Sequence, residues 1–162
     1  MSELKPQAVF LGRDGVLIKD IGNIVESDRV TLLPSVGEVL HHLNNLDIPI
    51  LMVFNEPLIG YGILAREKLM DITSHIQELL KPFKAEIDTV LWCPHKPQQS
   101  CFCRLPKPGL LYAAATKHWL DLRKCIYIGD TDQDVQAAKA VRMPYEKVKK
   151  GLADWKGWSL YE

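Results

Sequence analysis

The side chains that could do chemistry begin in the segment AVFLGRDGVL, residues 8–17. Its first four residues are apolar and predict a buried strand, and the glycine-containing loop that follows carries one carboxylate, Asp14. A hydrolase that forms an aspartyl-phosphate needs carboxylates at alternate positions of this loop, one to attack phosphorus and one to move protons. Gly12 stands at the first of these positions. The loop therefore keeps the second of these carboxylates and lacks the first.

A second group consists of three thiols and one imidazole, from Cys93, His95, Cys101 and Cys103. They fall within eleven residues, so a short loop can bring them to one point. Four nitrogen and sulfur ligands complete a tetrahedral zinc site and leave no position for water. We therefore expect a structural Zn²⁺ that folds a loop with little core of its own. The alternative is a chance grouping of surface cysteines.

A third group follows the apolar run at 125–129, where Asp130 and Asp134 are four residues apart. Carboxylates at the end of a strand can hold Mg²⁺ and orient its water. Acidic residues are also common at the beginning of a helix, because they complement the helix dipole. The pair alone leaves both interpretations open.

The elements that position these groups alternate between strand and helix. Apolar runs predict strands at residues 8–11, 48–54, 87–92 and 125–129, and helical periodicity predicts helices at about 36–43, 64–80, 108–120 and 132–141. Ser35 and Glu38 have the spacing of a capping box, and Thr131 is placed to cap the last helix. This order predicts an α/β fold with a parallel sheet between two layers of helices.

Ligands of such sheets bind beyond the carboxyl ends of the strands. Asp14, Asn55, Cys93 and Asp130 each follow a predicted strand, so we expect them at one edge of the sheet. The segment 145–148 is a candidate short edge strand. Trp155 and Trp158 have no clear period and either pack on the sheet or form a contact surface.

Composition limits the classes of protein that remain. The chain has 162 residues, enough for a single domain with a buried core, and 20 basic residues balance 20 acidic ones. Balanced charge argues against a nucleic-acid-binding domain. No apolar run approaches the roughly 20 residues of a membrane span, and the first residues do not resemble a signal peptide. We expect a cytoplasmic protein whose cysteines are thiols or metal ligands.

Together these segments resemble the haloacid dehalogenase (HAD) phosphohydrolase superfamily. The likeness covers about residues 7–141 and is greatest to the group of D-glycero-D-manno-heptose 1,7-bisphosphate phosphatases and histidinol-phosphate phosphatases. It rests on FLGRDGV at 10–16, the cysteine loop running into CRLPKPGL at 103–110, and the GD-x3-D segment at 129–134. The resemblance implies a three-layer, Rossmann-like HAD domain over residues 1–162, with a small zinc-bound loop and no large cap domain.

The resemblance also implies roles for individual residues. Asp14 matches the acid/base, Asp130 the Mg²⁺ ligand and Asp134 the residue that supports it. Lys107 matches the partner of the phosphate charge, Arg104 a contact to the substrate phosphate, and Asn55 a substrate-binding residue.

The chain departs from the family pattern at several positions in the same region. Gly12 replaces the nucleophile, and Phe54 replaces a phosphate-binding hydroxyl. Glu56 adds negative charge, Tyr61 stands in place of a basic residue, and Leu105 stands in place of a lysine.

We therefore expect a pseudophosphatase that binds a small phosphorylated ligand or a protein partner without turnover, with no role for nucleic acid or membrane. The alternative is a magnesium-dependent phosphatase of the heptose bisphosphate or histidinol phosphate type with residual or altered activity, in which Asp14 or Glu56 activates water. Zinc-dependent binding of nucleic acid is a third and less favoured hypothesis.

Overall fold

The apolar runs form one parallel sheet in the computed structural model, which describes residues 5–158. Its five strands are β1 (Val9–Leu11), β2 (Ile50–Asn55), β3 (Thr89–Cys93), β4 (Ile126–Gly129) and β5 (Tyr145–Lys147). The spatial order is β3-β2-β1-β4-β5. All neighbouring strands pair in parallel, with Phe10 of β1 opposite Leu51 and Tyr127. The predicted sheet is confirmed, including the edge strand at residue 145.

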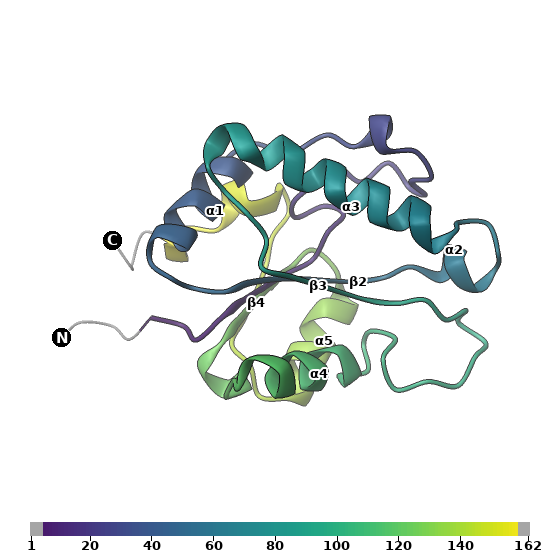
Figure 1. Ribbon diagram of the computed structural model, residues 1–162. Helices are drawn as coiled ribbons and strands as arrows, with labels where there is room; N and C mark the ends of the chain where they lie inside the picture. The colour runs from purple at the N-terminus through teal and green to yellow at the C-terminus, as the bar shows by residue number, and fades with distance from the viewer. Residues whose placement is uncertain (1–4, 159–162) are drawn as a thin grey trace.

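Helices cover both faces of this sheet (Figure 1). They are α1 (Val36–Asn45), α2 (Pro57–Gly60), α3 (Arg66–Leu80), α4 (Gly109–His118) and α5 (Asp132–Ala140). Successive residues of β1 point to opposite faces, so Val9 and Leu11 pack in the cluster that contains α1 and α3. Phe10 packs in the cluster that contains α4 and α5. Both faces are buried, which explains why the strands are almost wholly apolar.

Two local predictions differ from the structure. The capping box at Ser35 is wrong, because Ser35 has a left-handed backbone with φ of 70° and its side chain makes no capping hydrogen bond. The short helix α2 ends at Gly60 and is followed by a turn. The long helix α3 therefore begins at Arg66 rather than at about residue 64. The predicted cap at Thr131 is confirmed, because its hydroxyl accepts a hydrogen bond from the Asp134 N–H at 3.2 Å.

The position of β1 in the middle of the sheet brings the chemical groups together. β1 pairs with β2 on one side and with β4 on the other, so the segments that follow these three strands are neighbours. Asp14 follows β1, Asn55 ends β2 and Asp130 follows β4. The predicted convergence at the carboxyl edge is confirmed for these three residues, which line one cavity, whereas Cys93, the last residue of β3, is not among its lining residues.

The C-terminal part of the described chain packs against the loop after β1. The short 3-10 helix η4 (Gly151–Asp154) begins at Gly151, whose φ is +72°, and a side chain there would lie 2.8 Å from the carbonyl oxygen of Val16. The N–H of Leu152 donates to the same oxygen at 3.3 Å. Trp155 is buried, and Trp158 makes an edge-to-face contact with His42. Both tryptophans pack inward, as the first of the two sequence interpretations proposes.

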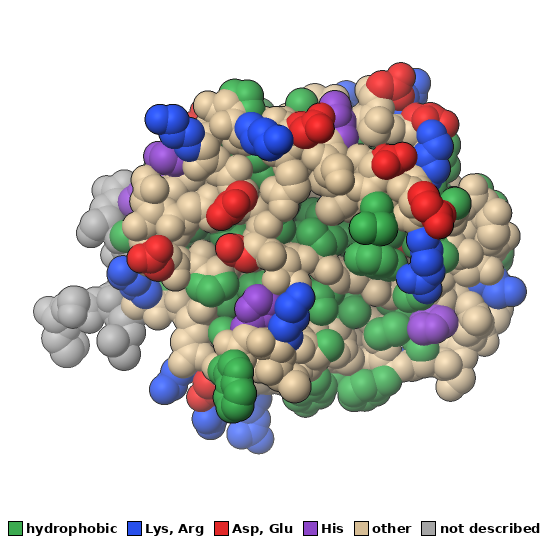
Figure 2. All heavy atoms as spheres, viewed as in Figure 1, with side chains coloured by type: hydrophobic (Ala, Val, Ile, Leu, Met, Phe, Trp, Pro, Cys, Tyr) green, Lys and Arg blue, Asp and Glu red, His purple; other side chains and the backbone are tan. Residues whose placement is uncertain are grey.

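The surface mixes both charges. Figure 2 shows Lys and Arg side chains interspersed with Asp and Glu on the face in view, without a continuous basic patch there.

Across residues 5–158, the helices are all too short or too polar to cross a membrane. These residues contain no large cap domain either, since every helix longer than a single turn packs against the sheet or its neighbours.

Replacing Trp155 by alanine should lower the free energy of unfolding by about 3–5 kcal/mol, because a large core side chain is lost and a cavity remains. The measurement is urea-induced unfolding followed by circular dichroism. Trp119→Ala is the matched control: Trp119 is 93% exposed whereas Trp155 is 1% exposed. The control should stay within about 0.5 kcal/mol of wild type. Equal effects of the two changes would contradict the packing described for the C-terminal segment.

Candidate functional site

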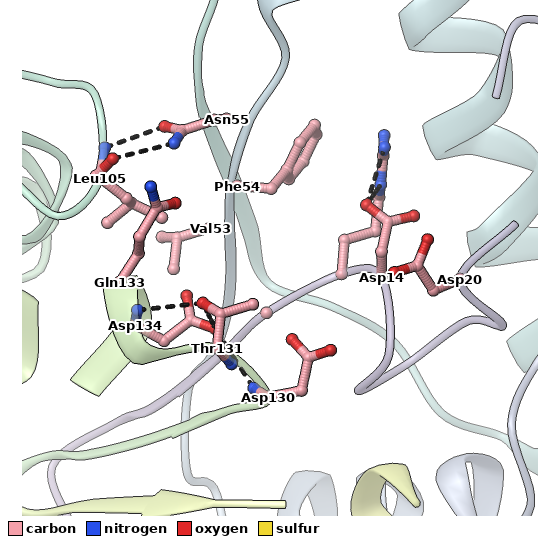
Figure 3. Close-up of a pocket in the computed structure, with 12 residues that line it drawn as sticks. Asp14, Asp20, Val53, Phe54, Asn55, Leu105, Asp130, Thr131, Gln133 and Asp134 are labelled. Atoms are coloured by element: carbon pink, nitrogen blue, oxygen red, sulfur yellow. Dashed lines mark hydrogen bonds and ion pairs between the residues drawn. The ribbon is translucent and has the colours of Figure 1, made fainter. Parts of the chain in front are cut away.

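A cavity of about 150 Å³ lies at the carboxyl edge of the sheet (Figure 3). The loop after β1, the end of β2, the loop after β4 and the loop that precedes α4 all contribute to it. It is lined by Gly12, Arg13, Asp14, Asp20, Val53, Phe54, Asn55, Leu105, Asp130, Thr131, Gln133 and Asp134.

The loop after β1 brings Gly12 and Asp14 into this cavity. The Gly12 N–H donates to the Ile128 carbonyl oxygen at 3.1 Å, which continues the sheet beyond β1. Gly15 has φ of +78°, and a side chain on it would lie 2.0 Å from Oδ2 of Asp130. Only glycine meets both conditions. Gly15 thus allows the Asp14 loop to lie directly against Asp130.

Arg13 is the cavity residue whose importance the sequence did not reveal. Its side chain is buried, and its Nη2 donates to Asp14 Oδ2 at 3.1 Å and to Glu56 Oε2 at 3.2 Å. Its guanidinium also lies 4.2 Å from the centre of the Phe54 ring, a cation–π arrangement. Glu56 is therefore paired with Arg13, and it is not among the residues that line the cavity.

Two carboxylates of the cavity, Asp14 and Asp130, favour their protonated forms more than carboxylates in water do. Burial raises the pKa of Asp14, although the Arg13 guanidinium opposes that shift. Burial and the negative charge of Asp134 raise the pKa of Asp130 to about 6. Asp20, which the sequence did not single out, lines the same cavity and adds repulsion to both groups. A bound cation would relieve this repulsion.

Asp134 supports the loop that carries Asp130. Its Oδ2 accepts from the N–H of Asp130 at 3.2 Å and from the hydroxyl of Thr131 at 2.9 Å. Its Oδ1 accepts from the buried hydroxyl of Tyr127 at 2.9 Å. These contacts tie Asp134 to the backbone of Asp130 and to Tyr127, and the role of Asp134 toward a metal ion stays a prediction.

Asn55 ties the end of β2 to the loop that leaves the cysteine cluster. Its amide nitrogen donates to the Leu105 carbonyl oxygen at 3.1 Å, and its amide oxygen accepts from the Leu105 N–H at 2.9 Å. Asn55 and Leu105 both line the cavity, so this pair builds part of its wall.

The two basic residues expected to contact phosphate lie outside the set that lines the cavity. The ammonium group of Lys107 donates to the Cys101 carbonyl oxygen at 2.6 Å. Arg104 is partly buried, and its Nη1 has no hydrogen-bond partner among the described residues. The roles of Lys107 and Arg104 toward a phosphate stay predictions.

The cysteine loop forms a candidate metal centre next to the cavity wall. The ligand atoms of Cys93, His95, Cys101 and Cys103 all lie within 4.8 Å of one another. Nδ1 of His95 is 3.3 Å from the sulfur of Cys93 and 3.2 Å from that of Cys103. Three sulfurs and one imidazole nitrogen that converge in this way fit Zn²⁺.

Comparison with known proteins identifies the class of protein. A family model for haloacid dehalogenase-like hydrolases matches residues 2–142, and the chain belongs to that family. A D-glycero-β-D-manno-heptose-1,7-bisphosphate 7-phosphatase of Helicobacter pylori strain J99 is 32% identical over 132 residues, covering 81% of this chain and 76% of the relative. The Escherichia coli K12 protein of the same name is 27% identical over 165 residues, covering 91% and 86%.

A solved structure gives the same result at the level of the fold. The D,D-heptose 1,7-bisphosphate phosphatase of B. bronchiseptica, complexed with magnesium and phosphate, matches with a TM-score of 0.85 at 27% identity. The match covers 90% of this chain and 82% of that one. The expected resemblance to heptose bisphosphate phosphatases is confirmed, whereas the likeness to histidinol-phosphate phosphatases stays a prediction.

Purified protein should contain about one zinc ion per chain, because the four ligands complete a single tetrahedral site. Cys101→Ser should lose the metal and lower the melting temperature, since metal binding and folding of this loop are coupled. Zinc content is measured by atomic absorption and melting by circular dichroism. Cys125→Ala is the control, because Cys125 is a buried thiol outside the cluster and its loss should leave zinc in place. Stable wild-type protein that holds no zinc would contradict the metal centre.

Proposed function

We propose that this domain is a pseudophosphatase: a homologue of the heptose bisphosphate phosphatases that binds a phosphorylated sugar at the cavity without forming an aspartyl-phosphate. The family assignment and the names of its relatives support the class of ligand. The position of the cavity supports the site, because parallel sheets bind ligands beyond the carboxyl ends of their strands.

The absence of a side chain at Gly12 is the observation that supports the proposed loss of turnover. Gly12 lines the cavity, and it stands where the resemblance to the family implies the nucleophile, with no side chain to attack phosphorus. Covalent catalysis requires a group that forms the bond, and removing such a group costs several orders of magnitude in rate in enzymes where this has been measured. Asp14 is held by Arg13, and replacing the nucleophile would require it to abandon its acid/base role.

The oxygen donors of the cavity suit Mg²⁺. Asp130 would hold the ion, which when bound would neutralise charge on a phosphate group. Gly12 contributes no carboxylate to this set, so we propose weaker magnesium binding than a site with carboxylates at both positions would have. Asp134 would act through Asp130, by fixing the backbone on which that ligand is carried.

A magnesium-dependent phosphatase with residual or altered activity is the second candidate. The relatives are named as phosphatases, so the comparisons support phosphatase activity more directly than they support its loss. Asp14 could then act as a general base toward water, which its raised pKa would favour. Glu56 is less suited to this role, because it pairs with Arg13 and does not line the cavity.

The cellular location and the partners of the protein are also proposals. We propose a cytoplasmic location, because thiols free to bind metal suit a reducing compartment. A small phosphorylated ligand or a protein partner agrees with the balanced charge, which gives no support to nucleic acid as a partner.

Heptose 1,7-bisphosphate should bind the wild-type protein in the presence of magnesium and release no phosphate above background. Histidinol phosphate and p-nitrophenyl phosphate should likewise not be hydrolysed. Binding is measured by isothermal titration calorimetry and turnover by release of inorganic phosphate. Robust turnover that disappears in Asp14→Asn would overturn the inactive assignment in favour of the second candidate.

Gly12→Asp should fold and yet recover little activity. A Cβ atom at this position meets Val16 Cγ2 at 3.2 Å and Asp134 Oδ2 at 3.7 Å, so a small shift of one methyl group admits it. The hydroxyl that Phe54 replaces and the lysine that Leu105 replaces are still missing in this variant. Phosphate release and melting temperature are measured together. Full activity from this single change would indicate that Gly12 is an isolated alteration of an otherwise competent site.

A further inference from the structure

Arg13 is the one basic side chain among the described residues that line the cavity. Arg13 is therefore the cation that an anion in the cavity would contact. The other charged residues of the lining are all acidic: Asp14, Asp20, Asp130 and Asp134. The guanidinium of Arg13 already pairs with two carboxylates of the protein. Its Nε and Nη2 both lie 3.1 Å from Asp14 Oδ2, and its Nη2 lies 3.2 Å from Glu56 Oε2.

Glu56 and Phe54 both contact the guanidinium of Arg13 and hold it in position. Arg13 and Glu56 are each 4% exposed, so their charges are removed from water and depend on each other. Phe54 and Glu56 are alternate residues where β2 ends, and the ring of Phe54 lies against the guanidinium. The Glu56 N–H donates to the Cys93 carbonyl oxygen at 2.8 Å, which anchors the backbone that carries the carboxylate.

Two of the positions where this chain is expected to depart from its family, Phe54 and Glu56, thus form one physical unit with Arg13. Phe54 and Glu56 are separate changes in the sequence, and both contact the same arginine in the structure. Glu56 supplies the negative charge that a ligand would otherwise bring to Arg13. Its carboxylate lies outside the cavity lining, so its charge can be removed without altering the cavity wall.

We propose that Glu56 is an internal anion that occupies Arg13 in place of a ligand phosphate, and that it determines how well this cavity accepts anions. The proposal rests on the proposed function in taking phosphate as the ligand group. It assigns Glu56 the role of a specificity-determining residue that acts through Arg13. In the wild-type protein a phosphate must compete with Glu56 and also face the carboxylates of the cavity.

The test compares the affinity of inorganic phosphate for wild type and for Glu56→Gln, by isothermal titration calorimetry with magnesium present. Glutamine keeps the shape of glutamate and removes its charge. We expect phosphate to bind Glu56→Gln at least about tenfold more tightly, because one buried negative charge next to the guanidinium is lost. Glu26→Gln is the matched control, since it removes a surface pair with Lys68 at 2.9 Å, and it should bind phosphate as wild type does.

Glu56→Asp covers the case in which the glutamine variant does not fold. Aspartate keeps the charge but is shorter by one methylene group, so it cannot keep the 3.2 Å contact with Arg13 without a backbone shift. Phosphate should bind this variant more tightly than wild type. Folded variants with the phosphate affinity of wild type would overturn the proposal.

The control outcomes separate this proposal from the proposed function. An equal gain in Glu26→Gln would also overturn the role of Glu56, because the effect would then reflect net charge alone. The proposed function is judged by heptose bisphosphate on wild type, not by inorganic phosphate on the variants. Tighter phosphate binding in Glu56→Gln supports the role of Glu56 even when wild type fails to bind the sugar bisphosphate.

Discussion

All five strands of the sheet run in the same direction, and the arrangement of every chemical group in this chain depends on that constraint. Parallel strands must end at a common edge, so the segments after β1, β2 and β4 meet although they are far apart in sequence. Close approach then requires residues without side chains. Gly15 lies against Asp130, and a side chain on Gly129 would collide with Asp134. The edge can hold its carboxylates close together because these backbones lack a Cβ atom.

Two polar clusters at this edge satisfy their charges in different ways. Asp134 accepts hydrogen bonds from a tyrosine hydroxyl, a threonine hydroxyl and backbone N–H groups, which stabilises the loop after β4. Arg13 depends on carboxylates from two different loops and on an aromatic ring. The first cluster contains the GD-x3-D segment on which the resemblance to the family rests, and the second contains Phe54 and Glu56, at which the sequence is expected to depart from the family pattern.

The sequence alone predicted the strands and the group of metal ligands, because both depend on the pattern of residues within a short segment. Apolar runs placed the strands to within two residues, because a buried strand of a parallel sheet must be apolar on both faces. The thiols and imidazole of the metal centre were predicted because they are near one another in sequence. The conformation of Ser35 and the four-residue helix α2 were missed, because neither has a periodic signal. The pairing of Arg13 with Glu56 was also missed, since it joins residues 43 positions apart. The orientation of Lys107 likewise depends on how its loop folds.

The contact between Gly151, Leu152 and Val16 has a consequence for the order in which the domain is completed. The family model matches residues 2–142, so this contact joins a segment outside that match to the loop that carries Asp14. On the ribosome, β1 emerges first and must wait for β4 to supply its second neighbour and for η4 to cover the loop after it. Such pairing across most of the chain is slow to form, because loop closure precedes any gain from contact. The cavity edge thus depends on contacts of long sequence separation, although the loop that carries Asp14 follows the first strand of the sheet in chain order.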